Sequence, residues 1–320
     1  MSKNKRTLKF RPDGTFTIAQ FTDVHWIDGC EEDLRSRALM ETVIREEKPD
    51  VVFFTGDVIY TGGVKAGRQP CLDPRGALRE AAACAEERGV PWALVFGNHD
   101  TENYITREEL AAEVEAFAHS VFERGPAELS GCGNYALVIE GADGKAAAAL
   151  YGFDSGAYSG LPHVEGYDWI RRDQIDWYLR ESRRLTERNG GEPLPALAFF
   201  HIPLPEYEQV WRTRTCYGSK HEDVCAPKLN SGLFAALAEA GDVMGTFCGH
   251  DHVNDYWGEL HGIRLCYGRA TGYNTYGRDG FPRGARLIRL NEGRRGFESW
   301  LRLDDGTVVT SQPEHIPERG

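Results

Sequence analysis

Five short polar segments each follow an apolar run and carry side chains of the kinds that bind metal ions. They are Asp23-Val24-His25, Gly56-Asp57, Gly97-Asn98-His99-Asp100, His201 and Gly249-His250-Asp251-His252. Carboxylate, imidazole and amide groups without cysteine suit borderline and hard ions such as manganese, iron or zinc. Each segment alone has an ordinary explanation, such as a Gly-Asp turn or a hydrogen-bonded core histidine. Five of the ten histidines fall in these segments, however, and this recurrence favours one shared site.

Two of the segments hold paired ligands and are expected to continue extended from their strands. Successive side chains on an extended segment alternate between its two faces. Asp23 and His25 should therefore project to the same side and bind one ion together. The same alternation predicts that His250 and His252 lie on one side of their segment.

The other segments supply single ligands. Gly56 allows the chain to leave its strand sharply, which leaves Asp57 at the lip of the sheet. Asn98 offers a neutral oxygen, and His99 beside Asp100 suits an imidazole whose proton position is fixed by a carboxylate.

Seven candidate ligands are too many for one tetrahedral ion: Asp23, His25, Asp57, Asn98, His201, His250 and His252. They divide between two ions with one ligand shared. Two ions about 3.5–4 Å apart are the usual apparatus for displacement at phosphorus. We expect Asp57 to bridge the ions, because it lies centrally in chain order among the contributing strands.

The elements that must position these residues alternate between apolar runs and amphipathic stretches. Strands are predicted at 15–21, 51–55, 92–96, 135–140, 147–153, 196–201 and 243–248, and helices at 34–47, 75–88, 106–122, 171–189 and from about 231. This alternation is typical of an α/β domain with parallel strands, in which ligands bind at the carboxyl ends of the strands. Short strands follow at 259–261, 263–267, 285–290 and 296–303. We expect one domain over 1–320, with a core of about 16–303 and a polar surface tail at 304–320.

Composition excludes several classes of function. The 37 basic and 49 acidic residues give a net charge of -12, which argues against a nucleic acid as the main partner. A small phosphorylated substrate remains compatible, because bound cations reverse the local field. Eight scattered cysteines without a CxxC pair indicate reduced thiols. The first residues lack the apolar core of a secretory signal, and no apolar run is long enough to span a membrane, so we expect a cytoplasmic protein with no membrane partner.

In this order, the five segments resemble the motifs of the calcineurin-like metallophosphoesterase superfamily, over about 16–290. The stretches FFHIPLPEY at 199–207, NSGLF at 230–234 and GHDHVNDY at 249–256 are similar to an intracellular branch related to purple acid phosphatases, best known from plants and fungi. The resemblance implies an α/β fold in which two mixed β-sheets pack together between flanking helices. It also implies a dinuclear site at the strand C-termini.

The resemblance assigns four side chains to each ion, with Asp57 in both sets. One ion takes Asp23, His25, Asp57 and His252, and the other takes Asp57, Asn98, His201 and His250. It gives His99 a catalytic role beside the leaving group, with Asp100 as a candidate orienting partner. The implied cofactors are two divalent or mixed-valence ions, manganese, iron or zinc.

Tyr60 is the one ambiguous position. Gly56-Asp57-Val58-Ile59-Tyr60 resembles the GDxxY motif of purple acid phosphatases, whose tyrosine binds ferric iron. Those enzymes have glycine where this chain has His25, so the two side chains would compete for one coordination position. We interpret His25 as the ligand and Tyr60 as a residue that supports the ligands or lines the pocket, and ligation by Tyr60 is the alternative.

The resemblance implies a phosphoester hydrolase, and the preferred interpretation is a phosphomonoesterase. In the expected mechanism a hydroxide held between the ions attacks phosphorus in line with the ester oxygen, and His99 protonates or polarises the leaving group. A small-molecule or nucleotide phosphodiesterase is the alternative. A nuclease is disfavoured by the acidic charge, and a non-catalytic scaffold by the intact ligand set.

Two polar clusters are candidates for substrate binding. The stretch 203–228 is long enough to form a flap over the site, and long loops are often functional. The candidates are Arg214 and Tyr217 in that stretch and Arg269, Tyr273, Tyr276 and Arg278 after the strand at 263–267. Solvated loop charge and packing tyrosines in turns explain the same residues equally well.

Overall fold

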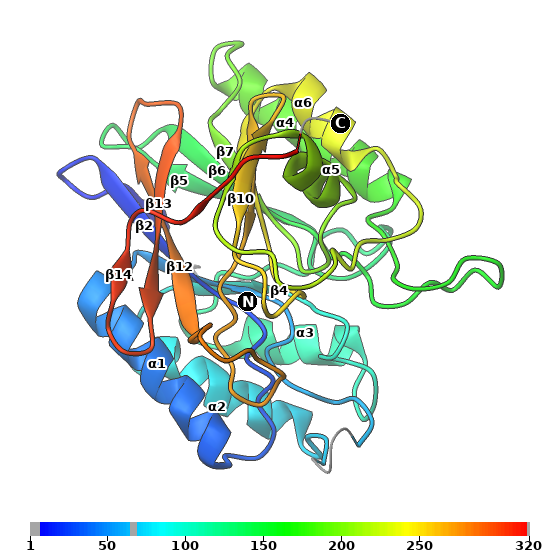
Figure 1. Ribbon diagram of the computed structural model, residues 1–320. Coiled ribbons are helices and arrows are strands. Elements are labelled where there is room, and N and C mark those ends of the chain that lie inside the picture. Colours follow the sequence, from blue (N-terminus) through cyan, green and yellow to red (C-terminus); the bar gives the residue numbers. More distant parts are fainter. Residues whose placement is uncertain (1–6, 65–68, 319–320) are drawn as a thin grey trace.

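In the computed structural model, which describes residues 7–64 and 69–318, two mixed β-sheets pack face to face between two groups of helices. Helices α1–α3 lie on one side and α4–α6 on the other (Figure 1). The sequence-based prediction of two mixed sheets flanked by helices is therefore confirmed. Among the described residues, no helix is long and apolar enough to cross a membrane.

The smaller sheet has six strands in the order β14-β13-β12-β2-β3-β4. Its parallel part is β2 (Thr15–Phe21), β3 (Val51–Thr55) and β4 (Trp92–Val95), and its antiparallel part is β12 (Gly284–Asn291), β13 (Phe297–Leu303) and β14 (Val308–Val309). The helices that follow its parallel strands are α1 (Glu31–Glu47), α2 (Pro74–Glu86) and α3 (Arg107–Ala116). All five residues of β3 are buried, because both faces of this strand are covered.

The larger sheet has nine strands in the order β1-β5-β6-β7-β9-β11-β10-β8-β15. They are β1 (Leu8–Lys9), β5 (Tyr135–Glu140), β6 (Ala146–Gly152), β7 (Ala196–Phe199), β8 (Cys216–Tyr217), β9 (Val243–Cys248), β10 (Trp257–Leu260), β11 (Ile263–Tyr267) and β15 (Glu314–His315). Strands β6, β7, β9 and β11 are parallel, so their carboxyl ends lie at one edge. Helices α4 (Arg172–Arg188), α5 (Glu206–Thr213) and α6 (Leu233–Ala240) accompany this sheet.

Stacked phenylalanines join the two sheets. Phe53 of β3 and Phe199 of β7 have ring centroids 4.0 Å apart, and Phe247 of β9 lies 5.2 Å from Phe199. Phe297 of β13 continues the row at 5.4 Å from Phe247. These contacts hold the strand ends of both sheets in register with one another, which is the requirement for a site built from both.

The predicted capping box at Thr106 is confirmed, since Thr106 and Glu109 bond to each other's backbone N–H groups. The predicted end of this helix is wrong: it stops at Ala116 rather than near residue 122. Phe117 is extended, and Ser120 pairs with Trp92 beside β4. Sheet pairing in the tertiary structure overrides the local helical preference here.

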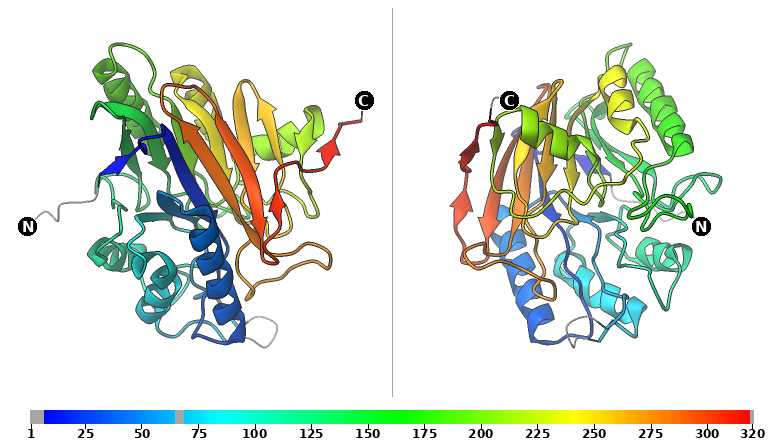
Figure 2. Two further views of the ribbon diagram at one scale, coloured as in Figure 1. Left: turned by 90° about the vertical axis from the view of Figure 1, so that its left-hand side faces the viewer. Right: turned by 45° about the vertical axis from the view of Figure 1, so that its right-hand side comes forward.

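The two segments expected to be irregular contain structure of their own. The stretch 203–228 includes α5 and β8, and Tyr207 of α5 is fully buried against the larger sheet, so the stretch is not simply a flap. In the tail, β14 pairs with the smaller sheet and β15 with the larger one, as the red end of the chain in Figure 2 shows. The tail therefore ties the two sheets together as well as covering them.

Candidate metal centre

The seven predicted ligands follow the carboxyl ends of five strands. Asp23 and His25 follow β2, Asp57 follows β3, Asn98 follows β4, His201 follows β7, and His250 and His252 follow β9. The first three strands belong to the smaller sheet and the last two to the larger sheet. All seven side chains are buried. The site is therefore formed where the two sheets end side by side.

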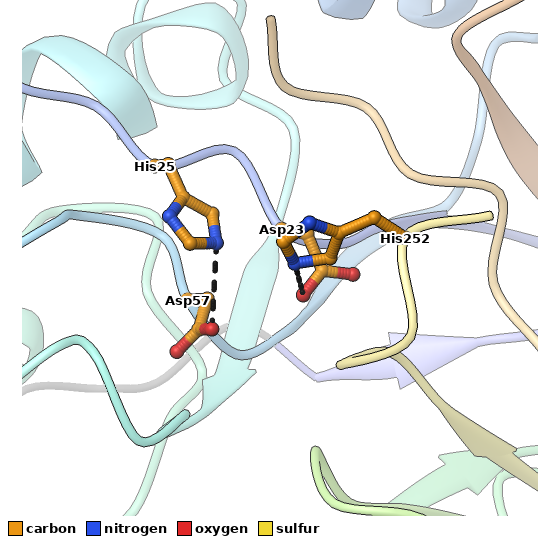
Figure 3. A group of neighbouring side chains, drawn as sticks. All are labelled: Asp23, His25, Asp57 and His252. Atoms are coloured by element: carbon orange, nitrogen blue, oxygen red, sulfur yellow. Dashed lines mark ion pairs between the residues drawn. The ribbon is translucent and has the colours of Figure 1, made fainter. Parts of the chain in front are cut away.

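One group consists of Asp23, His25, Asp57 and His252, whose ligand atoms lie within 4.8 Å of one another (Figure 3). The Nε2 atom of His25 is 3.4 Å from Asp57 Oδ2, and Nε2 of His252 is 3.5 Å from Asp23 Oδ1. These separations bring the four side chains close enough together to share one metal ion.

A second group consists of Asp57, His201 and His250, again with ligand atoms within 4.8 Å. His201 Nε2 lies 3.2 Å from Asp57 Oδ2, 3.2 Å from His250 Nδ1 and 3.1 Å from the amide oxygen of Asn98. Asp57 is common to both groups, and its Oδ2 faces His25 on one side and His201 on the other.

Four of these residues have left-handed backbone conformations: Asp23 (φ 54), His25 (φ 54), Asp57 (φ 49) and His250 (φ 76). Such angles are uncommon for residues other than glycine, and they concentrate at functional sites. The sequence-based expectation that the two paired segments are extended is therefore wrong. Asp23 and His25 do share a group, but through tight turns, whereas His250 and His252 face different groups.

Glycines allow the turns to approach one another. A Cβ atom on Gly97 would lie 2.1 Å from Asp57 Oδ1, and one on Gly249 would lie 1.8 Å from Thr22 Oγ1. Any other residue at these positions would displace the ligand turns.

Unpartnered atoms test whether the site fits a metal. His25 Nε2, Asp57 Oδ2 and His250 Nε2 are buried and have no hydrogen-bond partner within the described ranges 7–64 and 69–318. An unpaired buried polar atom costs about 1–3 kcal/mol. A cation held by these atoms removes that cost, so the donor set fits.

The electrostatics point the same way. Burial raises the pKa of Asp23, but His252 and His201 outweigh it and lower this pKa to about 2. Burial likewise opposes ionisation of Asp57, yet the charge of His201 and His99 brings its pKa well below the usual value. Conversely, burial lowers the pKa of His201, but Asp57 raises it to about 9. The buried carboxylates of Asp23 and Asp57 are therefore stabilised in their ionised form by positive charge beside them. A protonated His201 supplies that charge when no cation is bound.

His99 and Asp100 differ from the expected pairing. His99 Nδ1 lies 2.8 Å from Oε2 of Glu102, which sequence reasoning missed. The Asp100 carboxylate instead accepts backbone N–H groups of Gly97 and Asp57, at 2.7 and 3.0 Å, and of Ile59. The prediction that Asp100 orients the His99 ring is therefore wrong, and Asp100 shapes the ligand turns. No standard motif spacing pointed to Glu102.

Tyr60 lies beside the centre as predicted for a wall. Its ring stacks on His25 with centroids 5.6 Å apart, and its hydroxyl donates to the carbonyl of Gly63 at 2.8 Å. His25, in contrast, lies within a ligand group. This arrangement agrees with the interpretation of His25 as the ligand.

Of the predicted substrate-binding residues, Tyr276 contacts a predicted ligand. Its ring stacks on His252 at 4.3 Å, and its hydroxyl donates to Glu222 at 2.6 Å. Two tyrosines that sequence reasoning missed also border the centre. Tyr158 accepts a hydrogen bond from Asn98, and Tyr167 meets His250 edge-on.

Arg269 and Tyr273 have partners other than the predicted ligands, and their role in substrate binding stays a prediction. Arg269 is buried and forms an ion pair with Asp255 at 2.5 Å. The Tyr273 hydroxyl donates to Asp304, and the guanidinium of Arg35 covers its ring.

The remaining three candidates are also placed by other contacts. Arg214 is an exposed residue at the end of α5, and Tyr217 in β8 stacks on Trp257. Arg278 is exposed and pairs with Phe281 through the backbone. Each of these three residues thus belongs to the end of a helix, to a strand near the edge of the larger sheet or to a surface turn.

Comparisons with known proteins agree with this geometry. The family described as calcineurin-like phosphoesterase matches residues 16–254. The chain is 37% identical to "Probable inactive purple acid phosphatase 29" of Arabidopsis thaliana, over 96% of the chain and 88% of that protein. It is 33% identical to "Phosphatase DCR2" of Saccharomyces cerevisiae, over 91% of the chain and 54% of that protein.

Solved structures share the fold. A dimetal phosphatase from Danio rerio superposes with a TM-score of 0.56 at 14% identity, covering 93% of this chain and 99% of that one. GAP50, the anchor in the inner membrane complex of Plasmodium, gives 0.54 at 12% identity, covering 95% and 90%. The buried His/Asp groups are consistent with the dinuclear site typical of such proteins. The chain belongs to the calcineurin-like phosphoesterase family.

Proposed function

We propose that this chain is a metal-dependent phosphoester hydrolase with two ions, acting on small phosphomonoesters in the cytoplasm. The observation that carries the proposal is the Asp57 carboxylate. Its Oδ2 is buried, lacks a hydrogen-bond partner among the described residues, and lies between His25 and His201, one from each ligand group. A shared carboxylate of this kind suits two ions spaced for displacement at phosphorus.

The chain would hold the ions as the family resemblance assigns them. Asp23, His25, Asp57 and His252 would bind one, and Asp57, Asn98, His201 and His250 the other. When bound, manganese, iron or zinc ions supply Lewis-acid activation of water and of the phosphoryl oxygens. The buried, turn-held ligands fix the position of that chemistry relative to His99.

His99 is suited to protonate the leaving group. A carboxylate only accepts hydrogen bonds, so Nδ1 donates to Glu102 and Nε2 is the nitrogen left for the substrate. Burial lowers the pKa of His99, but the charges of Asp57 and Glu102 outweigh it and raise this pKa above the ordinary value. A raised pKa favours the protonated ring, which is the form that a general acid requires.

Two further observations support a small monoester. One relative is named a phosphatase, and the chain's net charge of -12 disfavours a polyanionic partner. The name of another relative includes "probable inactive". In this chain, however, all seven predicted ligand positions carry residues that can bind metal, which supports the proposal of a catalytic protein.

The test uses protein stripped with a chelator and resupplied with manganese, iron or zinc. Turnover is measured on p-nitrophenyl phosphate and on bis(p-nitrophenyl) phosphate, with Asp57→Asn and the exposed Glu108→Gln as paired variants. Metal-restored hydrolysis of the monoester that Asp57→Asn alone loses supports the proposal. Hydrolysis of the diester only would indicate a phosphodiesterase. Two bound ions without turnover on either ester would indicate a non-catalytic scaffold.

A further inference from the structure

Glu102 connects His99 to a second residue of the centre. Its Oε2 lies 2.8 Å from His99 Nδ1, and its Oε1 accepts the hydroxyl of Tyr158 at 2.6 Å. The Tyr158 oxygen in turn accepts from the side-chain amide of Asn98 at 3.1 Å. Both oxygens of Glu102 are therefore used, and the same carboxylate restrains the rings on either side of it.

The backbone places this carboxylate independently of His99's ring. The amide of Glu102 donates to Thr61 Oγ1 at 2.8 Å, and the Thr61 hydroxyl donates to the carbonyl of His99. Asn103 also donates to the Thr61 carbonyl at 2.8 Å. A Cβ atom on Gly62 would lie 2.2 Å from Glu102 Oε2, so the absence of a side chain there makes room for the carboxylate.

We propose that Glu102 is a positioning residue, which holds the His99 ring so that Nε2 addresses the oxygen of the leaving group. The inference rests on the proposed hydrolysis. As the oxygen of an attacking hydroxide forms its bond to phosphorus, the P–O bond to the leaving group breaks. The electron pair of the broken bond stays on the leaving oxygen, which takes the Nε2 proton of His99. The His99 ring is then neutral, and its Nδ1–H still donates a hydrogen bond to Glu102. Solvent later returns a proton to Nε2.

Leaving groups of different basicity separate this role from a structural one. An alkyl phosphate needs the proton in the transition state, whereas p-nitrophenolate leaves without it. General acid–base catalysis typically raises the rate about 100- to 10,000-fold. If the His99 ring is not held in the right orientation, part of this rate increase is lost. For Glu102→Gln we expect kcat to fall about 10- to 100-fold on an alkyl phosphate and less than about 3-fold on p-nitrophenyl phosphate, with KM unchanged.

Two variants serve as controls. Tyr158→Phe removes the hydroxyl but leaves the contact between His99 and Glu102. Its kcat on the alkyl phosphate, relative to its kcat on p-nitrophenyl phosphate, should therefore stay close to the wild-type ratio. Glu108→Gln, an exposed change of the same chemistry on α3, should match the wild type. Metal content by mass spectrometry should equal the wild type in all three. An equal loss on both esters in Glu102→Gln, or no loss on either, would overturn the proposal.

A second measurement does not depend on turnover. Nitrogen-15 labelling of histidine reports which ring nitrogen of His99 carries its hydrogen in the zinc-loaded protein. We expect protonated, exchange-protected Nδ1 in the wild type and loss of that protection in Glu102→Gln. An unprotonated Nδ1 in the wild type would refute the role of Glu102 even if the protein hydrolyses esters. Conversely, protected Nδ1 in an inactive protein would refute only the proposed hydrolysis.

Discussion

Replacing Asp57 by Asn should weaken both metal positions at once. The two side chains have the same shape, and Asn retains the oxygen that accepts the His99 backbone N–H at 2.8 Å. The change therefore acts on Oδ2, which faces His25 at 3.4 Å and His201 at 3.2 Å. An amide nitrogen at that position donates hydrogen bonds and does not bind a cation.

The size of the effect follows from what Asp57 does in each group. Losing a partner outside the ligand set already costs about 10- to 100-fold in metal affinity. Here a ligand and a negative charge are removed from both groups, so we expect at least about 100-fold weaker binding, or roughly 2.8 kcal/mol, at each position. Asp23→Asn is the matched comparison, because Asp23 belongs to the first group alone.

Isothermal titration of chelator-treated protein with zinc or manganese measures these affinities, and elemental analysis after desalting counts the ions retained. The wild type should retain two ions, Asp23→Asn about one and Asp57→Asn fewer than one. Melting temperatures should confirm that both variants are folded. Two ions bound to Asp57→Asn with wild-type affinity would refute the shared-ligand reasoning.

Three other perturbations give further tests. On an alkyl phosphate, His99→Ala should lower kcat about 100- to 10,000-fold while two ions remain bound, and unchanged turnover of that ester would remove His99 from the mechanism. The pKa of His201 is about 9 without metal, so below that pH a proton must leave before the ring binds a cation. Metal affinity should therefore rise with pH up to about 9, with proton release visible when titrations in two buffers of different ionisation enthalpy are compared; identical heats would contradict this. Phe199→Ala, which removes the ring stacked 4.0 Å from Phe53, should lower the free energy of unfolding by about 3–5 kcal/mol in urea denaturation. A loss below about 1 kcal/mol would mean that the sheets are joined by other contacts.

Much of the fold was predictable from local patterns. The strands at Thr15–Phe21, Val51–Thr55 and Val243–Cys248 have the predicted bounds, because most residues of a buried strand are apolar and the strand ends where polar residues begin. The helix start at Thr106 was predictable because a capping box is satisfied within four residues. The Asp, His and Asn side chains that follow the strands could likewise be identified from the sequence.

Other elements depend on contacts between distant parts of the chain. Tyr207 and its helix α5 are held by burial against the larger sheet, and the tail strands form only because two sheet edges accept them. The periodicity of so short a helix, or of a two-residue strand, is too weak to detect in sequence.

Which side chains are available to bind metal, and that they follow strands, could be read from local patterns, since both are properties of short segments. The family resemblance assigned these side chains to two groups around Asp57, and the structure brings them together in that way. The contact of Glu102 rather than Asp100 with the His99 ring, in contrast, follows from the tertiary structure alone. Asn98 and His201, for example, lie 103 residues apart yet 3.1 Å from each other. Distances of this kind depend on how two sheets pack and how left-handed turns aim their side chains, and no local pattern encodes either.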